Sequence, residues 1–451
     1  MTKVFTVSIG KGNLEFVGVD VGIRPGLPRF VVGGLATHRA PETRERLRNA
    51  CKSSKLPWPQ GRVTVSLVPV GNPKHGSLLE LGIVAALFCS RYETVAYLGS
   101  VGIQGNVMSA PGMLGALSYC ARHKVAAVVP KDAERLAGLV PGLVYATVSH
   151  IRELLQAPRF IQSDGASTVR PTRDAYLIDT ILGHQQVKRA LLIALAGKHP
   201  LLLWGPVGSG KTALVEASLE LLPPFGQGEL LDATERAAKQ GLDLASYDRQ
   251  LVTVPITSSV PQLLGKSGHW SSATGGLLFL DELPEYCRAS RESLRAPLQA
   301  LLGGKPGPAV VIAAGNLRKC GNTGTNQRCT CSGSEAARYR QSLGAALLDR
   351  FALHVQVPWQ APDDWGVGQC TGKVYAETIA RIWNDKATRQ NMQVDSRAEN
   401  LLHKAVEKLR LSGRSRILVV EVAKTIAVIE KEGVVLPEHI SEALQYRMRV
   451  N

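Results

Sequence analysis

The fold is decided by the stretch Gly205-Pro206-Val207-Gly208-Ser209-Gly210-Lys211-Thr212. It follows an apolar run at residues 200–204 that is typical of a buried strand, and a helical pattern begins at Thr212. The glycines allow the backbone to turn so that consecutive N–H groups point inward at a triphosphate, and the helix directs its positive end to the same place. We therefore predict a nucleotide-binding loop made of all these residues.

Two side chains of this loop and two acids predict the chemistry. Lys211 is expected to reach the β- and γ-phosphates of ATP, and the Thr212 hydroxyl is placed to hold Mg²⁺. A second apolar run, residues 276–280, ends in Asp281 and Glu282. In P-loop enzymes the first such carboxylate steadies the Mg²⁺ shell and the second orients and deprotonates the attacking water. The alternative is an ordinary strand followed by an acidic helix cap; we predict ATP hydrolysis.

Length and composition bound the remaining possibilities. A chain of 451 residues with 45% hydrophobic residues is long enough for two or three globular domains. No apolar run approaches the roughly twenty residues that cross a bilayer, and residues 1–7 alternate like a strand and do not resemble an export signal. The eight cysteines lack the density of a secreted disulfide framework. We expect a cytoplasmic protein with no membrane partner.

The charge distribution points to a polyanionic partner. The net charge is +16, and residues 288–350 hold ten Lys or Arg against three acids. An excess of Lys and Arg can also reflect a basic proteome or a solvated surface. Because the excess is concentrated beside the second nucleotide motif, it favours nucleic acid.

Periodicity predicts an α/β chain with three domains and one linker. Residues 1–155 form an α+β domain, 156–175 a polar linker, 176–358 a parallel sheet covered on both faces, and 359–451 a small helical domain. Within the first domain the pattern predicts strands at 14–21, 29–32 and 63–68, helices at 41–52, at 78–88 and from 111, and a glycine hairpin at 97–105.

Several motifs together resemble one family, the ComM (YifB) group of AAA+ ATPases, which are relatives of the magnesium-chelatase ATPase subunit. They are the nucleotide-binding loop and residues 181–191, 278–286, 347–355, 411–414 and 439–447. The first domain resembles the Lon-protease-like domain of this group, most specifically at 69–77, and the last resembles the magnesium-chelatase C-terminal type. The resemblance implies an ATP-driven hexameric ring that moves along DNA, a helicase or branch-migration factor in natural transformation or recombination.

The resemblance also implies roles for three further residues. Asn316 is similar to the sensor that touches the γ-phosphate or the attacking water, although an Asn at a strand end is often a turn former. Arg350 is similar to the arginine finger that enters the neighbouring subunit's site. Arg414 is similar to the second sensor arginine, which acts on its own subunit's nucleotide. For either arginine alone a surface ion pair is the favoured interpretation, and the spacing within the family pattern reverses that preference. A finger supplied in trans requires a homo-oligomer.

Two departures from the family pattern change the expected chemistry. Ser77 stands where Lon-type proteases carry a nucleophile, but residues 110–117, which resemble the lysine-bearing helix, contain no lysine. Without a base the hydroxyl is a weak nucleophile, so we predict a non-proteolytic domain. The family's set of four cysteines is reduced to Cys320, Cys329 and Cys331. A closed zinc site takes four ligands, so these residues are predicted to be a weakened or metal-free remnant.

Two more departures leave the partner open. Residues 255–259 lack the family's Pro-His-His, and 298–308 replace a longer hairpin that normally projects toward the pore. The leading hypothesis is an ATPase ring that moves on single-stranded or branched DNA without sequence preference. The alternative is a nucleotide-dependent assembly or remodelling factor that acts on another protein, as in the chelatase relatives.

Overall fold

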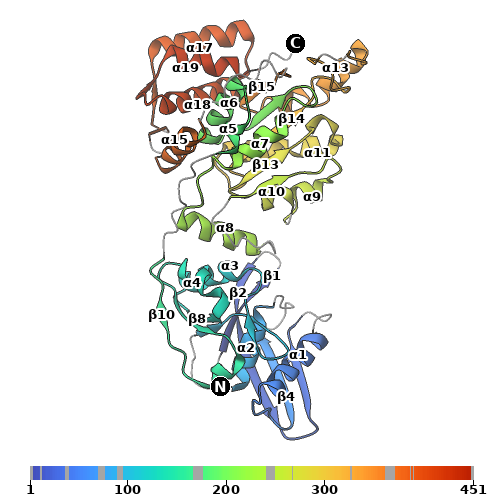
Figure 1. Cartoon of the computed structure of the whole chain (residues 1–451), viewed down its shortest axis with the longest axis vertical. Coiled ribbons are helices and arrows are strands. Elements are labelled where there is room, and N and C mark those ends of the chain that lie inside the picture. Colours follow the sequence, from blue (N-terminus) through green and yellow to red (C-terminus); the bar gives the residue numbers. More distant parts are fainter. Residues whose placement is uncertain are drawn as a thin grey trace. The chain divides into compact units, whose positions relative to one another are not determined.

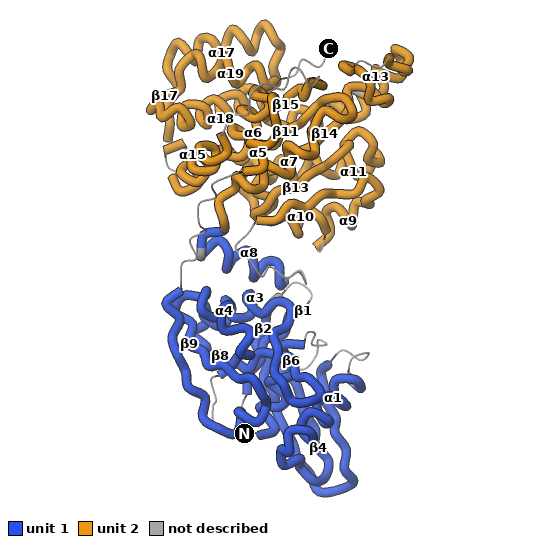
Figure 2. Tube along the Cα trace, in the orientation of Figure 1, with its two compact units in different colours: residues 1–169, 225–247 blue, residues 170–224, 248–451 orange. Residues whose placement is uncertain are grey.

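The computed structural model describes residues 4–10, 13–35, 40–69, 77–88, 95–165, 176–239, 249–266, 268–325, 328–360, 371–385, 388–389 and 391–447. The chain divides into two compact units (Figure 2). Unit 1 comprises residues 1–169 and 225–247, and unit 2 comprises residues 170–224 and 248–451. Among the described residues, no helix is both long and apolar enough to span a membrane.

Unit 1 is built on an eight-stranded mixed sheet in the order β10-β9-β8-β5-β1-β2-β4-β3 (Figure 1). The strands are β1 Val4–Gly10, β2 Asn13–Arg24, β3 Arg29–Gly33, β4 Arg62–Val68, β5 Val95–Tyr97, β8 Ala126–Pro130, β9 Val144–Val148 and β10 Ile161–Gln162, and a hairpin consists of β6 Ser100–Val101 and β7 Val107–Met108. The helices are α1 Ala40–Ser53, α2 Leu79–Phe88, α3 Met113–Arg122, η1 Lys131–Ala133, α4 Glu134–Gly138, η2 Ile151–Leu155 and α8 Gln227–Lys239.

Alternation along the strands explains the two faces of this sheet. In β4 the side chains of Val63, Val65 and Leu67 are buried, whereas the residues between them are exposed or half-buried. One face packs against α1 and α2, and the other packs against α3, α4 and α8. The strands and helices expected within the first 155 residues are confirmed, with bounds that differ by a few residues.

Helix α8 belongs to unit 1, although it lies between two elements of unit 2 in the sequence. Ser118 on α3 donates a hydrogen bond to Glu235 on α8 at 2.9 Å, and Arg122 pairs with Asp232 at 2.7 Å. A side chain at Gly115 would meet α8 at 2.8 Å, so a glycine lets the two helices come close. The prediction of one uninterrupted segment at 176–358 therefore differs from the structure, because α8 packs in the core of unit 1.

Parts of the expected linker and of one family stretch are not covered by the structure. Residues 166–175 of the expected linker, and 70–76 within 69–77, lie outside the described residues. The first half of the expected linker is not wholly irregular, because β10 pairs with β9 at the edge of the sheet. A two-residue edge strand has too little alternation to be recognised from sequence.

Unit 2 contains a five-stranded, all-parallel sheet in the order β12-β13-β14-β11-β15. The strands are β11 Leu201–Trp204, β12 Leu251–Thr253, β13 Leu277–Leu280, β14 Val310–Gly315 and β15 Leu353–Gln356. The surrounding helices are α5 Leu177–Thr180, α6 Gln185–Gly197, α7 Lys211–Leu219, α9 Val260–Leu264, α10 His269–Ser272, η3 Leu283–Glu285, α11 Arg288–Ser293, α12 Arg295–Leu302, α13 Gly333–Gln341 and α14 Ala345–Leu348. Strands β11, β13 and β14 are buried along their whole length, as expected for a sheet covered on both faces.

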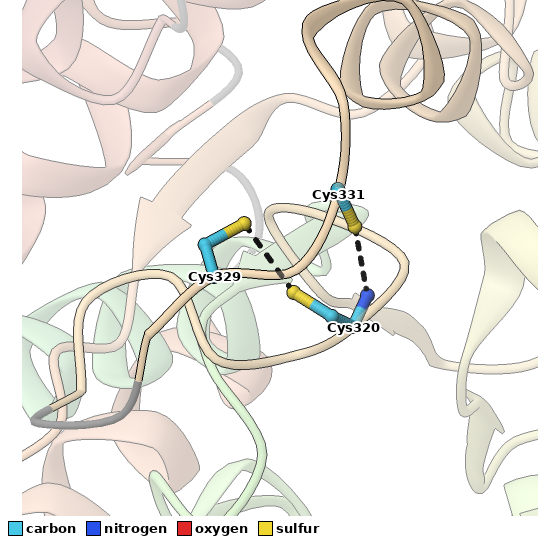
Figure 3. A group of neighbouring side chains, drawn as sticks. All are labelled: Cys320, Cys329 and Cys331. Atoms are coloured by element: carbon cyan, nitrogen blue, oxygen red, sulfur yellow. Dashed lines mark hydrogen bonds between the residues drawn. The ribbon is translucent and has the colours of Figure 1, made fainter.

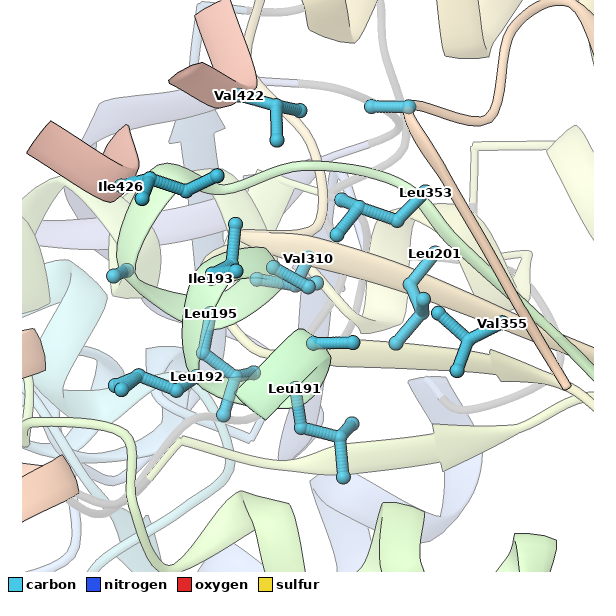
Figure 4. Packing of buried hydrophobic residues seen from close by; sticks show 14 of the residues in the cluster. Leu191, Leu192, Ile193, Leu195, Leu201, Val310, Leu353, Val355, Val422 and Ile426 are labelled. Atoms are coloured by element: carbon cyan, nitrogen blue, oxygen red, sulfur yellow. The ribbon is translucent and has the colours of Figure 1, made fainter. Parts of the chain in front are cut away.

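The C-terminal helices share the core of this sheet. They are α15 Gly372–Asn384, α17 Ser396–Leu409, α18 Gly413–Ile429 and α19 Pro437–Gln445, with a short parallel pair, β16 Gln393–Val394 and β17 Val434–Val435. Figure 4 shows Val422 and Ile426 of α18 near Ile193 of α6, which packs on the strands at Leu201 and Leu353. The expected fold class is confirmed: mixed α/β with a parallel sheet and a helical C-terminal region.

Candidate nucleotide site

The nucleotide-binding loop joins β11 to α7, and each of three glycines has a physical reason. Gly208 and Gly210 have φ angles of 75° and 82°, in the left-handed region that side chains rarely adopt. A Cβ at Gly205 would lie 2.3 Å from the carbonyl oxygen of Val357. The loop therefore packs closely against the end of β15 and turns twice before α7 begins at Lys211.

Lys211 is fixed at the mouth of this loop. Its Nζ donates hydrogen bonds to the carbonyl oxygens of Gly205 and Pro206, at 2.9 and 2.7 Å, and to Oδ1 of Asn316 at 3.3 Å. Burial lowers the pKa of Lys211, and the nearby Asp281 and Glu282 carboxylates oppose that shift. The ammonium group thus lies among the groups expected to meet a γ-phosphate.

Asp281 and Asn316 converge because their strands are neighbours. β13 and β14 are parallel and end at the same edge of the sheet, so the residues that follow them lie side by side. Oδ2 of Asp281 accepts a hydrogen bond from Oγ1 of Thr212 at 3.3 Å. Hydroxyl and carboxylate oxygens are ligands that Mg²⁺ takes, so this pair fits a magnesium ion. The buried Asn316 closes the opposite side through its contact with Lys211.

Glu282 occupies a strained turn directly after Asp281. Its φ is 50°, a left-handed conformation that costs a non-glycine residue about 1–3 kcal/mol. The turn is held by the Glu282 N–H, which donates to Oδ1 of Asp281 at 2.9 Å. The side chain is exposed, and its charge reaches Lys211. Such strain is typical of residues that must present a side chain to a reacting group.

The two predicted arginines lie together in a second cluster around Asp349. Arg414 pairs with Asp349 at 3.5 Å, and Arg447 pairs with the same carboxylate at 3.2 Å. Arg350 Nε donates to the carbonyl oxygen of Arg295 at 2.8 Å, and its Nη1 donates to that of Ala346. Partial burial and the neighbouring Arg414 and Arg295 lower the pKa of Arg350. The roles of Arg350 and Arg414 toward a nucleotide remain predictions.

A cavity of about 410 Å³ adjoins the nucleotide-binding loop, and most of its lining was not predicted. It is lined by Thr180, Ile181, Leu182, His184, Gly208, Ser209, Gly210, Trp359 and Gln360. Within the described part of the chain, His184 Nδ1 and Gln360 Oε1 are buried polar atoms with no hydrogen-bond partner. Gly183 passes so close to Gln360 that a Cβ there would lie 2.3 Å from Oε1. Residues 359–360 follow β15 without any local pattern, so only their position at the end of a strand could have indicated them.

The three cysteines predicted from the family pattern do meet (Figure 3). Their Sγ atoms lie within 4.8 Å of one another, and those of Cys320 and Cys329 are 3.5 Å apart. Cys331 Sγ accepts a hydrogen bond from the Cys320 N–H at 3.3 Å, and backbone N–H groups lower the pKa of Cys320 to about 6. In the described ranges no fourth histidine, cysteine or carboxylate joins the group, and Cys370 lies outside them. The set fits an open three-thiolate site and does not fit a closed zinc site.

Comparisons with known proteins cover most of the chain. The family described as "Magnesium chelatase, subunit ChlI" matches residues 178–364, "Subunit ChlI of Mg-chelatase" matches 19–133, and "Magnesium chelatase, subunit ChlI C-terminal" matches 374–447. The chain is 30% identical to "Competence protein ComM" of Haemophilus influenzae, over 96% of this chain and 95% of that protein.

Two further relatives extend the same likeness. An uncharacterised protein, YifB, of Escherichia coli is 28% identical over 96% of this chain and 94% of its own length. An uncharacterised protein of Mycobacterium tuberculosis is 30% identical over 87% of this chain and 85% of its own. Since the likeness runs through the nucleotide-binding loop, its acids and the C-terminal helices, the chain belongs to the magnesium-chelatase family of AAA+-type ATPases, in its ComM/YifB group.

Proposed function

We propose that this protein hydrolyses ATP in a homo-oligomeric ring, a hexamer by analogy with its family, and uses the cycle to move on DNA. One observation carries the ATPase part: Lys211, Asp281 and Asn316 converge at the carboxyl edge of a parallel sheet, beside an amide-lined loop. This is where open α/β folds bind nucleotides. A helicase or branch-migration role, as in natural transformation or recombination, is the finer proposal.

The proposed chemistry assigns one step to each group. The N–H groups of the nucleotide-binding loop and Lys211 bind the β- and γ-phosphates. Thr212 and Asp281 would hold a magnesium ion, which would supply positive charge to neutralise the phosphates. Glu282 accepts the proton of the attacking water, and Asn316 orients that water. The adenine binds in the adjoining cavity, where Gln360 Oε1 can accept a hydrogen bond from its amino group.

The hydrolytic step is tested by Glu282→Gln. This change removes the proton acceptor and keeps the size of the side chain, so turnover should fall by about a hundredfold or more while ATP binding persists. The measurement is phosphate release at saturating ATP, together with binding of a fluorescent ATP analogue. Glu285→Gln is the matched control, because Glu285 is an exposed acid of the same turn. Unchanged turnover in Glu282→Gln would refute the assignment.

The DNA partner is supported by charge and by family. Residues 288–350 carry an excess of seven positive charges, and Lys305, Lys319 and Arg328 among them are exposed. Contacts of lysines and arginines with phosphates are independent of base sequence and weaken steeply as salt rises. We expect forked or single-stranded DNA to stimulate ATP turnover and the stimulation to disappear at high salt.

Paired charge variants sharpen this test. Lys305→Gln together with Lys319→Gln should weaken DNA binding and reduce the slope of log affinity against log salt by about 2. Lys404→Gln together with Lys408→Gln, two exposed lysines of α17, serves as the control. Equal slopes for both pairs would argue against the basic segment as the DNA surface.

A second candidate function, nucleotide-driven remodelling of a partner protein, rests on the short segment before β14. Helix α12 ends at Leu302, and the chain enters β14 at Val310 after one turn. A long pore hairpin therefore does not fit here, which weakens the case for a grip on DNA. ATP turnover that ignores DNA of every structure but responds to a partner protein would favour this candidate.

We propose that the cluster of Cys320, Cys329 and Cys331 is a remnant of a zinc site. Three thiolates leave one of the four positions of a tetrahedral zinc ion without a protein ligand. Elemental analysis of purified protein should find well under one zinc per chain, and chelator treatment should leave ATP turnover unchanged. One tightly held zinc per chain would contradict this proposal.

A further inference from the structure

The arginine cluster around Asp349 carries more positive charge than its acids offset. Asp349 already accepts hydrogen bonds from Ser412 and Ser415, at 3.0 and 2.6 Å, as well as from Arg447. Its remaining ion pair, with Arg414, is longer at 3.5 Å. The carboxylate oxygens are therefore occupied by residues on the C-terminal side of the cluster, and among the described residues no hydrogen bond or ion pair joins them to Arg350 or Arg295.

Arg295 is the least satisfied member of the cluster. Its nearest acid is Glu292 at 3.9 Å, and that carboxylate is held more closely by Arg288 at 3.0 Å. Among the described residues, Arg295 Nε is buried without a hydrogen-bond partner, while the side chain as a whole is 38% exposed. A guanidinium group has five N–H donors in a fixed planar fork, so this one has donors to offer at the surface.

Arg295 and Arg350 belong to the same piece of structure. The backbone carbonyl of Arg295 holds Arg350 Nε at 2.8 Å, and Arg295 Nη2 lies beside Gly344 at the start of α14. The two guanidinium groups are close enough to repel each other, and an anion bound beside them would offset that repulsion. An anion with several oxygens spaced for two forks, such as a phosphoryl group, is what this arrangement can bind.

We propose that Arg295 acts with Arg350 as a second arginine donated in trans, binding the phosphoryl oxygens of the nucleoside triphosphate held by a neighbouring copy of this chain. This inference rests on the proposed ring ATPase and adds a residue to its site. Two guanidinium groups on one phosphoryl group would share the charge that develops on its oxygens in the transition state. The phosphates of DNA are an alternative ligand for the two arginines, and the experiment below distinguishes them from the phosphates of the nucleotide.

The test compares Arg295→Ala, Arg350→Ala and Lys211→Ala, alone and in equal mixtures, without DNA. Arg295→Ala keeps the backbone carbonyl that holds Arg350, so it removes only the guanidinium group. Alone it should lower turnover at saturating ATP at least about tenfold, with little change in ATP affinity. Mixed with Lys211→Ala it should recover activity, because the mixture forms interfaces between an intact nucleotide site and an intact Arg295. Random assembly predicts recovery to about a quarter of the wild-type turnover.

Arg397→Ala is the control, since Arg397 is an exposed arginine of α17 outside the cluster and shares no carboxylate with Arg295. Arg295→Gln and thermal unfolding separate a folding defect from a catalytic one, because Gln keeps length without charge. Normal turnover of Arg295→Ala, or no recovery on mixing while the Arg350→Ala mixture recovers, overturns the inference and leaves the ring ATPase standing. A defect seen only with DNA present would assign Arg295 to DNA phosphate. If neither arginine variant alters turnover, the proposed ring ATPase itself fails.

Discussion

The two clusters of unit 2 differ in how their charges are satisfied. Around Lys211 the positive charge is offset within the chain, because the ammonium group lies among carbonyl oxygens, Asn316 and two nearby carboxylates. Around Asp349 four arginines face a single saturated acid and the distant Glu292. A self-contained cluster can bind its ligand within one subunit, whereas a cluster with excess positive charge is completed by an anion from elsewhere. Under the proposed ring, the first cluster would bind ATP in its own subunit and the second would act on the nucleotide of the neighbouring subunit.

The largest expected effect separates the two clusters by the step that each supports. Lys211→Ala should weaken ATP binding about a hundredfold, because it removes charge-assisted hydrogen bonds to the phosphates. Arg350→Ala should leave binding within about twofold and slow turnover about a thousandfold, as expected for an arginine finger. Equilibrium binding and single-turnover hydrolysis measure the two effects. If Arg350→Ala impaired ATP binding as much as Lys211→Ala, the assignment of the two clusters to different steps would be wrong.

The next effect concerns the acid that holds the arginine cluster together. Asp349→Ala should reduce the free energy of unfolding by about 2–3 kcal/mol, since it leaves Arg447, which is 8% exposed, without its carboxylate. Asp349→Asn should lose less, because the amide oxygen still accepts from Ser415. Chemical denaturation measures both. Glu432→Ala, an exposed acid elsewhere in the helical region, is the control, and an equal loss there would remove the special role of Asp349.

The pH dependence of stability tests a histidine that contacts the backbone on either side of Asp349 and Arg350. His354 Nε2 lies 3.1 Å from the carbonyl oxygen of Leu348 and 3.2 Å from that of Phe351. Burial, with a smaller contribution from Arg447, lowers the pKa of His354 to about 4. The unfolded chain then binds a proton more readily than the folded one, so stability is full above about pH 6.5 and is lost as the pH falls toward about 4.

The expected slope in that window is about 1.4 kcal/mol per pH unit from this residue. His354→Gln should make the unfolding free energy less dependent on pH between 6.5 and 5, and His403→Gln, an exposed histidine of α17, should not. Denaturant midpoints at several pH values measure it. If the unfolding free energies of wild type and His354→Gln changed in parallel with pH, the stability of this region would not depend on a neutral imidazole at position 354.

The smallest expected effect concerns the nucleobase, which we propose binds in the cavity beside the nucleotide-binding loop. Gln360→Ala removes the buried Oε1 that can accept a hydrogen bond from the adenine amino group, so the preference for ATP over GTP should fall about fivefold. Competition between the two nucleotides measures it. Gln356→Ala, an exposed glutamine of β15, is the control. An unchanged preference would leave the cavity without a role in choosing the base.

The sequence allowed us to predict that Lys211, Asp281 and Asn316 lie together, because the determinants of the loop and of the strand ends are local. Glycines that need left-handed backbone, and acids that directly follow an apolar strand, lie within a few residues of one another. The cavity beside the loop could not be predicted in this way, because residues 181–184 and 359–360 are brought together only by the sheet. The arrangement of Arg295 with Arg350 was also missed, since Arg350 is held by a carbonyl oxygen 55 residues away in the sequence.

Helix α8 shows the same limit on a larger scale. Its amphipathic pattern indicates a helix with one apolar face, but the pattern does not say which core receives that face. Leu230, Ala233 and Ala237 pack with residues of α3 rather than with the parallel sheet. The segment 176–358, drawn from periodicity alone, therefore included a helix that belongs to the other unit.

The excursion of α8 also has a consequence for biosynthesis. The sequence of unit 2 is interrupted after Pro224 and resumes at Asp248. Unit 1 therefore receives its last helix only after the ribosome has begun to synthesise unit 2. Its nascent form would carry an uncovered apolar strip on α3 until Lys239 has emerged. A truncated ATPase made by deleting the first 169 residues would display the complementary strip of α8 to the solvent, which makes that fragment prone to aggregation.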